Sequence, residues 1–198
     1  MPLTHLLYLH GFRSSPQSTK ARQMAAVMQR SHAAVRWWCP QLPPSPSAAM
    51  KLLTDQIDAW QREPGFGRVA VVGSSLGGFY ATAVAEQWGC RAVLLNPAVH
   101  PARDLQRYIG EQTSWQQPAE RFFFKPAFID ELWHIDPGPL RHPENYLAVI
   151  AKGDEVLDWR EMAARYAGAR LEILEGGDHA LSDFDHHLPL ILDFLQLS

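Results

Sequence analysis

Short apolar runs alternate with amphipathic stretches along the chain, and this pattern predicts a fold of alternating strands and helices. Six runs read as buried strands, at residues 6–9, 34–39, 69–72, 92–95, 146–151 and 171–174. Hydrophobic positions recur at helical spacing between several of them, at residues 18–30, 47–62 and 76–88. Strands that are apolar on both faces are typical of a parallel sheet with helices on each side. We therefore expect a compact α/β fold, with a mostly parallel sheet of about six to seven strands and helices on both faces.

One long segment, residues 96–145, interrupts this alternation where a single helix would suffice. Pro118 and Pro126 interrupt it, and its aromatic residues are Tyr108, Trp115, Phe122, Phe123, Phe124, Phe128 and Trp133. One interpretation is a helical excursion whose aromatic side chains pack on the edge of the sheet. The other is a small helical cap over the strand ends, in which Trp115 and Phe124 line an apolar substrate pocket. We expect a single domain over residues 1–198, with 96–145 as a cap-like insertion.

The composition narrows the class of protein. A chain of 198 residues that is 46% hydrophobic can bury one sizeable core. Its formal charge of −3 gives no basic surface for nucleic acid, and no apolar run reaches the roughly 18 residues of a membrane span. The first residues lack the charged region of a signal peptide, and Cys39 and Cys90 occur singly. We expect a cytoplasmic protein whose cysteines are reduced and form neither a disulfide framework nor a metal site.

The chemistry-bearing motif is Gly-Ser-Ser-Leu-Gly at residues 73–77, directly after the apolar run 69–72. A G-x-S-x-G sequence between a buried strand and a helix is typical of a nucleophile elbow, which exposes its central serine above the sheet. A Gly/Ser-rich turn without chemical function is the alternative interpretation. The elbow makes Ser75 the candidate nucleophile, because the strained turn forces that side chain out of the strand.

A serine hydroxyl needs a general base and a group that orients the base. His179 follows the last predicted strand and precedes the C-terminal helix, where the order Ser–Asp–His places the base. Asp154 lies in the loop after strand 146–151 and is the candidate acid. Glu155 and Asp158 in the same loop are its rivals, although an acidic loop can also simply cap the following helix.

Two backbone amides are expected to bind the oxyanion, those of Leu76 after the nucleophile and Phe12 after the first strand. Phe79, in the helix behind the elbow, is a candidate substrate contact. Arg13 and Lys20 follow the first strand and could bind a phosphate or carboxylate of the substrate. The alternative for both cations is an ordinary solvated charge.

Six segments spread over nearly the whole chain carry a family resemblance: residues 8–16, 40–46, 73–78, 95–98, 153–158 and 176–179. In these segments the chain resembles the α/β-hydrolases, and among them the small bacterial YqiA-type esterase family, which is UPF0227-like. The resemblance implies a compact hydrolase with a shortened sheet and esterase activity, including activity on acyl-CoA thioesters.

The resulting hypothesis is hydrolysis of a small-molecule ester or acyl-CoA thioester through an acyl-enzyme on Ser75, without a metal or organic cofactor. Two other classes stay open. One is a different hydrolase with the same triad, such as a peptidase or lactonase. The other is a non-catalytic interaction protein that kept the fold.

Overall fold

A six-stranded, entirely parallel sheet forms the centre of the molecule in the computed structural model, which describes residues 1–197. The strand order is β2-β1-β3-β4-β7-β8. The strands are β1 (Leu3–Leu9), β2 (Arg36–Trp38), β3 (Arg68–Ser74), β4 (Arg91–Leu95), β7 (Tyr146–Ala151) and β8 (Arg170–Leu174). All six predicted strands are confirmed, although β2 is shorter than its apolar run because it pairs with β1 over three residues only.

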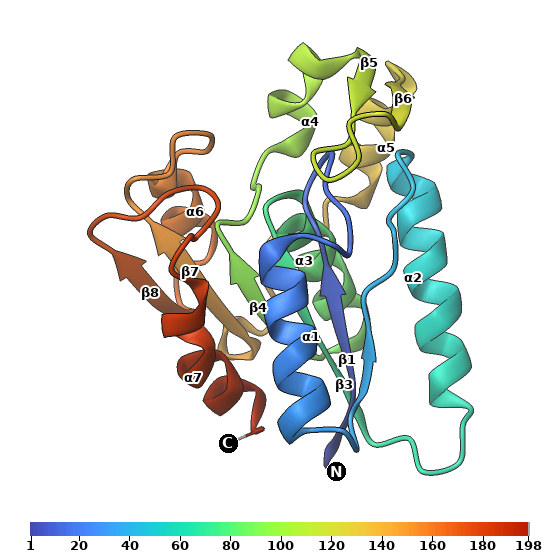
Figure 1. Ribbon diagram of the computed structural model, residues 1–198, viewed down its shortest axis with the longest axis vertical. Coiled ribbons are helices and arrows are strands. Elements are labelled where there is room, and N and C mark those ends of the chain that lie inside the picture. The colour runs from blue at the N-terminus through green and yellow to red at the C-terminus, as the bar shows by residue number, and fades with distance from the viewer. Residues whose placement is uncertain (198) are drawn as a thin grey trace.

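Helices cover both faces of the sheet, and they do so because neighbouring strand residues point to opposite sides (Figure 1). Leu6 and Tyr8 of β1 pack with α1 (Thr19–Ser31) and α7 (Phe184–Leu195). Leu7 and Leu9 pack in a second core with α2 (Pro46–Gln61), α3 (Leu76–Trp88) and α6 (Trp159–Arg165). The α/β architecture with helices on both faces is thus confirmed.

The 96–145 segment lies over the carboxyl ends of the strands (Figure 1). It contains α4 (Pro101–Asp104), strands β5 (Gly110–Thr113) and β6 (Arg121–Phe124), helix α5 (Ala127–Ile135), and 3-10 turns at Gln106–Tyr108 and Pro143–Asn145. Strands β5 and β6 form an antiparallel hairpin, so the expectation of an all-helical segment is wrong. The aromatic run in β6 favours extended backbone, because large side chains pack well on a pleated strand.

Helix α5 ties this segment to the body of the molecule. The Glu131 carboxylate accepts hydrogen bonds from Ser45 Oγ at 2.7 Å and from the Ser47 backbone at 2.9 Å. Both donors stand at the start of α2, where a negative charge is favourable next to the unpaired amides of the first turn. The segment therefore has a fixed anchor on α2.

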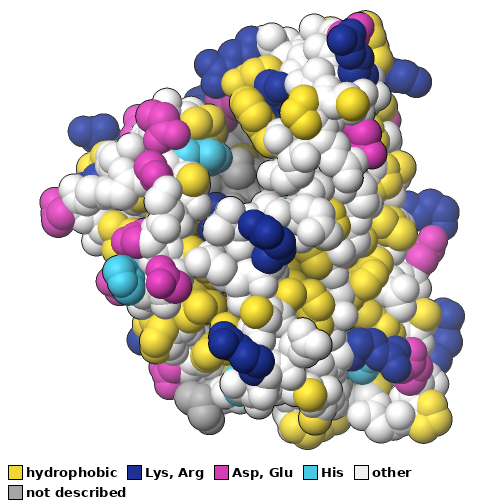
Figure 2. All heavy atoms as spheres, viewed as in Figure 1, with side chains coloured by type: hydrophobic (Ala, Val, Ile, Leu, Met, Phe, Trp, Pro, Cys, Tyr) yellow, Lys and Arg dark blue, Asp and Glu magenta, His cyan; other side chains and the backbone are white. Residues whose placement is uncertain are grey.

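Aromatic side chains of the segment divide between core and surface. Phe124 and Phe128 are buried, whereas Trp115, Phe123 and Trp133 are each more than half exposed. Hydrophobic and basic side chains stand next to each other over this part of the surface, and the face is hollowed beside it (Figure 2). Within residues 1–197, the helices are too short or too polar to cross a bilayer.

Candidate active site

Ser75 stands at a sharp turn between β3 and α3, with backbone angles φ 56° and ψ −122°. A non-glycine residue rarely adopts this conformation, and it persists only where the surroundings fix it. The close approach around it requires glycine. A Cβ on Gly77 would lie 1.9 Å from the Leu9 oxygen, and one on Gly73 would lie 2.2 Å from the Gly77 oxygen. The sequence motif therefore folds as the nucleophile elbow that it predicts.

The structure brings the predicted serine, histidine and aspartate into one chain of hydrogen bonds. Ser75 Oγ lies 3.0 Å from His179 Nε2, and His179 Nδ1 lies 2.7 Å from Asp154 Oδ2. A carboxylate can only accept, so Nδ1 carries the proton that bonds it and Nε2 is left to accept from the serine hydroxyl. This arrangement can move the serine proton to the ring.

Asp154 is held by its own loop. Its side chain has no exposed surface, and its Oδ1 accepts hydrogen bonds of 2.8 Å from the backbone amides of Val156 and Leu157. The two other acidic residues of the loop have different partners. Glu155 accepts a hydrogen bond from the backbone amide of His179 at 3.0 Å, and Asp158 caps helix α6. Of the three acidic residues, Asp154 is the one bonded to the histidine ring.

Asn96 was not predicted as a site residue. It is fully buried at the end of β4, with φ 41°. Its Nδ2 donates to the backbone oxygens of Asp178 at 2.9 Å and His179 at 3.3 Å, and its Oδ1 accepts from Ala151 at 2.8 Å. Asn96 thus joins the histidine loop to the end of β7. An asparagine directly after a strand is a usable signal, since asparagine tolerates a positive φ.

The two amides expected to form an oxyanion hole are free to donate. Within residues 1–197, neither the N–H of Phe12 nor that of Leu76 has a hydrogen-bond acceptor. Leu76 is the first residue of α3, where helical amides lack an internal partner. The loop that carries Phe12 runs directly over the nucleophile, because a Cβ on Gly11 would lie 3.1 Å from Ser75 Cβ.

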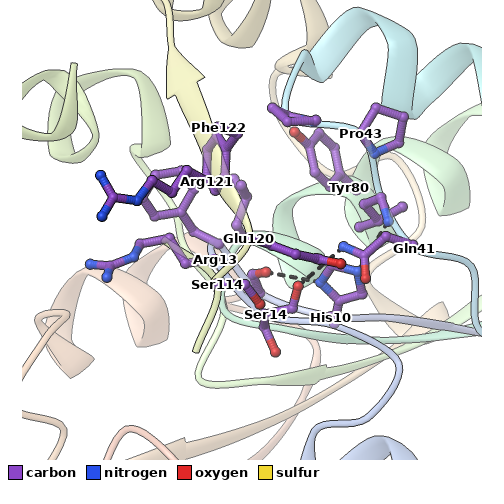
Figure 3. A pocket seen from close by; sticks show the side chains of 15 residues that line it. His10, Arg13, Ser14, Gln41, Pro43, Tyr80, Ser114, Glu120, Arg121 and Phe122 are labelled. Atoms are coloured by element: carbon purple, nitrogen blue, oxygen red, sulfur yellow. Dashed lines mark hydrogen bonds between the residues drawn. The ribbon is translucent and has the colours of Figure 1, made fainter. Parts of the chain in front are cut away.

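Two pockets meet at the loop formed by residues 10–14. The first, with a volume of 370 Å³, contains Ser75, His179, Lys20 and Trp115, and we call it the serine pocket. The second, of 260 Å³, is lined by apolar groups, by the polar side chains of His10, Ser14, Gln41 and Ser114, and by the charged Glu120, Arg13 and Arg121 (Figure 3). Its apolar lining comes from Phe12, Leu42, Pro43, Pro44, Leu76, Tyr80 and Phe122. We call it the side pocket.

The structure supports only some of the predicted substrate contacts. Trp115 lines the serine pocket. Phe79 is buried in α3, which is apolar on almost every side and embedded in the core, and Phe124 is buried among aromatic rings. Neither phenylalanine lines the serine pocket or the side pocket. Arg13 borders the side pocket, but its guanidinium is bonded to Thr113.

Lys20 lines the serine pocket from the first turn of α1. Its amine donates a hydrogen bond to the backbone oxygen of Ala180, the residue after the candidate base. Burial lowers the pKa of Lys20 to about 8, although the nearby carboxylates of Asp178 and Asp154 act in the opposite direction. Lys20 is therefore a cation of the site that loses its proton easily.

Within residues 1–197, no group of three histidine, cysteine or acidic side chains is arranged to hold a metal ion. Cys39 and Cys90 are free, and burial raises the pKa of each thiol to about 12. Burial therefore disfavours the thiolate, which is the reactive form of cysteine.

A family model described as "Uncharacterised protein family (UPF0227)" matches residues 5–196.

Three solved structures share the fold at low identity. Est1E from Butyrivibrio proteoclasticus is 16% identical over 98% of this chain and 86% of its own, with a TM-score of 0.68. The mouse α/β hydrolase domain-containing protein 10 is 17% identical over 98% and 90%, with a TM-score of 0.67. A structure from the metagenome-derived lipolytic enzymes LipS and LipT is 18% identical over 100% and 95%, with a TM-score of 0.70. The fold is thus the α/β-hydrolase fold.

Proposed function

The chain belongs to the UPF0227 family, as its YqiA-like motifs indicated, and from this premise we propose that it is a serine hydrolase acting on carboxylic esters or thioesters. The observation that carries the proposal is the hydrogen-bond chain from Ser75 through His179 to Asp154. In this geometry a weak nucleophile, its base and the group that orients the base stand in the order that acyl transfer requires.

The reaction proceeds through an acyl-enzyme. Ser75 Oγ attacks the substrate carbonyl while its proton passes to His179 Nε2, and Asp154 stabilises the imidazolium. The amides of Phe12 and Leu76 donate to the oxyanion. The tetrahedral intermediate collapses, and His179 gives its proton to the departing alcohol or thiol. Water then attacks the acyl-serine with His179 as base, which releases the carboxylic acid and restores the serine.

The side pocket is the proposed acyl site, because its lining is mostly apolar and includes Leu76, whose amide faces the reacting carbonyl in this mechanism. With a volume of 260 Å³, the pocket has room for a short or medium acyl chain or one aromatic ring. The acyl-CoA partner and the cytoplasmic location stay predictions.

The deciding experiment compares wild type and Ser75→Ala on a panel of chromogenic acyl esters. We expect the variant to lose at least about a thousandfold in kcat/KM, since a triad serine is the group that forms the covalent bond. Fluorophosphonate labelling with peptide mapping should place the label on Ser75. A fully folded Ser75→Ala protein within tenfold of wild-type activity would refute the proposal, and an unlabelled wild type would favour a non-catalytic role.

The same panel separates the finer alternatives. Esters and acyl-CoA thioesters of equal chain length distinguish oxygen from sulfur leaving groups, while peptides and lactones test the other serine-triad chemistries. A maximum at short or medium chains supports the side pocket as acyl site, and a flat profile contradicts it.

A further inference from the structure

Arg13 is bound to the β5–β6 hairpin by four contacts. Its Nε donates to the backbone oxygen of Thr113 at 2.8 Å, and one of its terminal nitrogens donates to Thr113 Oγ1 at 3.0 Å. The backbone amide of Trp115 donates to the Arg13 oxygen at 2.8 Å, and the guanidinium carbon lies 4.1 Å from the centre of the Trp115 ring. A planar, forked cation suits this combination of paired hydrogen bonds and stacking.

The backbone of Arg13 is itself constrained, with φ 60°. A residue with a Cβ is strained in this left-handed conformation, and the contacts to the hairpin hold it there. Arg13 directly follows Phe12, and the turn that it makes fixes the direction of the loop at the candidate oxyanion donor.

The side chain of Phe12 is anchored in the same segment. Its ring centre lies 5.5 Å from that of Tyr108, 6.0 Å from that of Phe122 and 5.2 Å from that of Phe124. The two contacts with the phenylalanines are edge-to-face, the favoured geometry of aromatic pairs. Residue 12 thus offers its amide to the site while its ring is held by the 96–145 segment.

His10, at the start of the 10–14 loop, is held by hydrogen bonds of its own. His10 Nε2 accepts a hydrogen bond from the Leu42 amide at 3.0 Å, so its proton is on Nδ1, which donates to the Gly11 oxygen at 3.0 Å. This bond fixes the start of the loop to the proline-rich segment, with no contribution from the hairpin. Gln41 Nε2 donates to the Ser14 oxygen at 3.2 Å and holds the far end of the loop to the same segment. Between these two points, Phe12 is held by Arg13 and the aromatic cluster.

A direct role of Arg13 in binding substrate does not fit its orientation. In Figure 3 its guanidinium points away from Tyr80, Pro43 and Gln41 on the opposite wall of the side pocket. Two of its five N–H donors are bonded to Thr113, and one face of the guanidinium is stacked on the Trp115 ring.

We propose that Arg13 is a positioning residue: by fastening the 10–14 loop to the β5–β6 hairpin, it holds the Phe12 amide where the oxyanion forms. The inference rests on the proposed function, and it gives the 96–145 segment a part in transition-state binding. Such a role predicts a loss in kcat rather than in substrate affinity, because the ground-state carbonyl makes little use of the oxyanion donors.

The test compares Arg13→Ala, Arg13→Lys and the control Arg22→Ala, which removes an exposed arginine from α1. With a small neutral ester, we expect Arg13→Ala to lower kcat on the order of ten- to a hundredfold, with KM within about threefold of wild type. The affinity for an alkylboronic acid, which forms a tetrahedral adduct on the serine, should fall in parallel with kcat/KM. Arg13→Lys should not restore either value, because an ammonium lacks the planar fork.

Three results would overturn the inference. One is an unchanged kcat and boronate affinity in Arg13→Ala. Another is recovery by Arg13→Lys, and the third is a rise in KM confined to anionic substrates, both of which would mark a simple charge contact. The acid limb of the pH–rate profile should stay unchanged, since His179 and Asp154 are not touched. If Arg13→Ala does not fold, Thr113→Val removes one acceptor only, and a kcat equal to that of wild type would then contradict the inference.

The outcomes also separate this inference from the proposed function. An inactive Ser75→Ala protein together with a fully active Arg13→Ala protein would refute the role of Arg13 alone. An active Ser75→Ala protein would refute the proposed function and remove the basis of the inference.

Discussion

The side chain of Asn96 donates a hydrogen bond to the backbone oxygen of His179, the residue whose ring bonds to the candidate nucleophile. The same amide bonds to the Asp178 oxygen, and its own oxygen accepts from Ala151 at the end of β7. One buried side chain therefore sets the distance between the sheet and the loop that carries the base.

Replacing Asn96 should reduce stability. Asn96→Ala removes these bonds, leaves buried backbone groups unpaired and puts alanine at a positive φ, so we expect a loss of about 2–4 kcal/mol in the free energy of unfolding. Urea denaturation measures this loss in the free energy of unfolding. Asn145→Ala is the matched control, because Asn145 is partly exposed and its side chain makes no hydrogen bond within residues 1–197. A loss below about 0.5 kcal/mol in Asn96→Ala, no larger than an ordinary surface substitution, would contradict the role.

Asp154→Asn should abolish most of the activity while the protein stays folded. An amide presents a donor to the ring, favours the wrong tautomer of His179 and cannot stabilise its charge, so we expect kcat to fall by about 10⁴-fold. Asp158→Asn is the control, since asparagine still caps a helix and activity should be unchanged. Steady-state kinetics on one chromogenic ester measures kcat for both variants. A larger loss of kcat in Asp158→Asn than in Asp154→Asn would make Asp158 the acid that orients His179.

His10 should make the protein less stable in acid. Burial lowers its pKa in the folded state, an effect only partly opposed by the hydrogen bond to the Gly11 oxygen. The neutral ring therefore contributes stability that is present above the unfolded pKa of about 6.5 and is lost as pH falls through the lower folded value. Urea denaturation between pH 8 and pH 5 should show a steeper loss for wild type than for His10→Gln. Parallel curves would be inconsistent with this contribution, whatever the effect of His5, whose pKa burial also lowers.

Lys20 should react early with acylating reagents. With its pKa lowered to about 8, a large share of Lys20 is unprotonated at pH 8, whereas an ordinary lysine with a pKa near 10.4 is almost fully charged. Limited acetylation at this pH, followed by peptide mass spectrometry, should modify Lys20 ahead of Lys51. Lys51 is the internal reference, because it is exposed and paired with Asp55. Preferential labelling of Lys51 would mean that access, and not protonation, controls the reaction.

The central sheet and the elbow could be predicted because their signals are local. Each strand of the sheet is a run of apolar residues, and the elbow is a motif of five consecutive residues, in which Gly73 must approach the Gly77 oxygen closely. The order of Ser75, Asp154 and His179 along the chain followed from the alternation of strands and loops. These residues meet because all three stand beyond the carboxyl ends of parallel strands of one sheet, namely β3, β7 and β8.

The β5–β6 hairpin and the surroundings of Arg13 and Phe79 could not be predicted, because they depend on contacts between distant parts of the chain. Strand β5 is polar and short, and its pairing with β6 across residues 114–120 carries no two-residue turn motif that would indicate a hairpin. Arg13 looked like a free cation, because its partner Thr113 lies 100 residues away. Phe79 follows the elbow by four positions, yet α3 is buried on nearly all sides, so nearness in sequence did not bring it to a pocket.

Phe12 belongs to two structural units at once, and this limits which segments can be exchanged between related chains. Its backbone amide is the proposed oxyanion donor, and its ring belongs to the aromatic cluster of the 96–145 segment. A chimera that receives this segment from a relative would place foreign side chains against the native ring, and the replacement would disturb the reaction even with every triad atom retained. Residues 10–14 and the 96–145 segment therefore form one transferable unit, although more than eighty residues separate them.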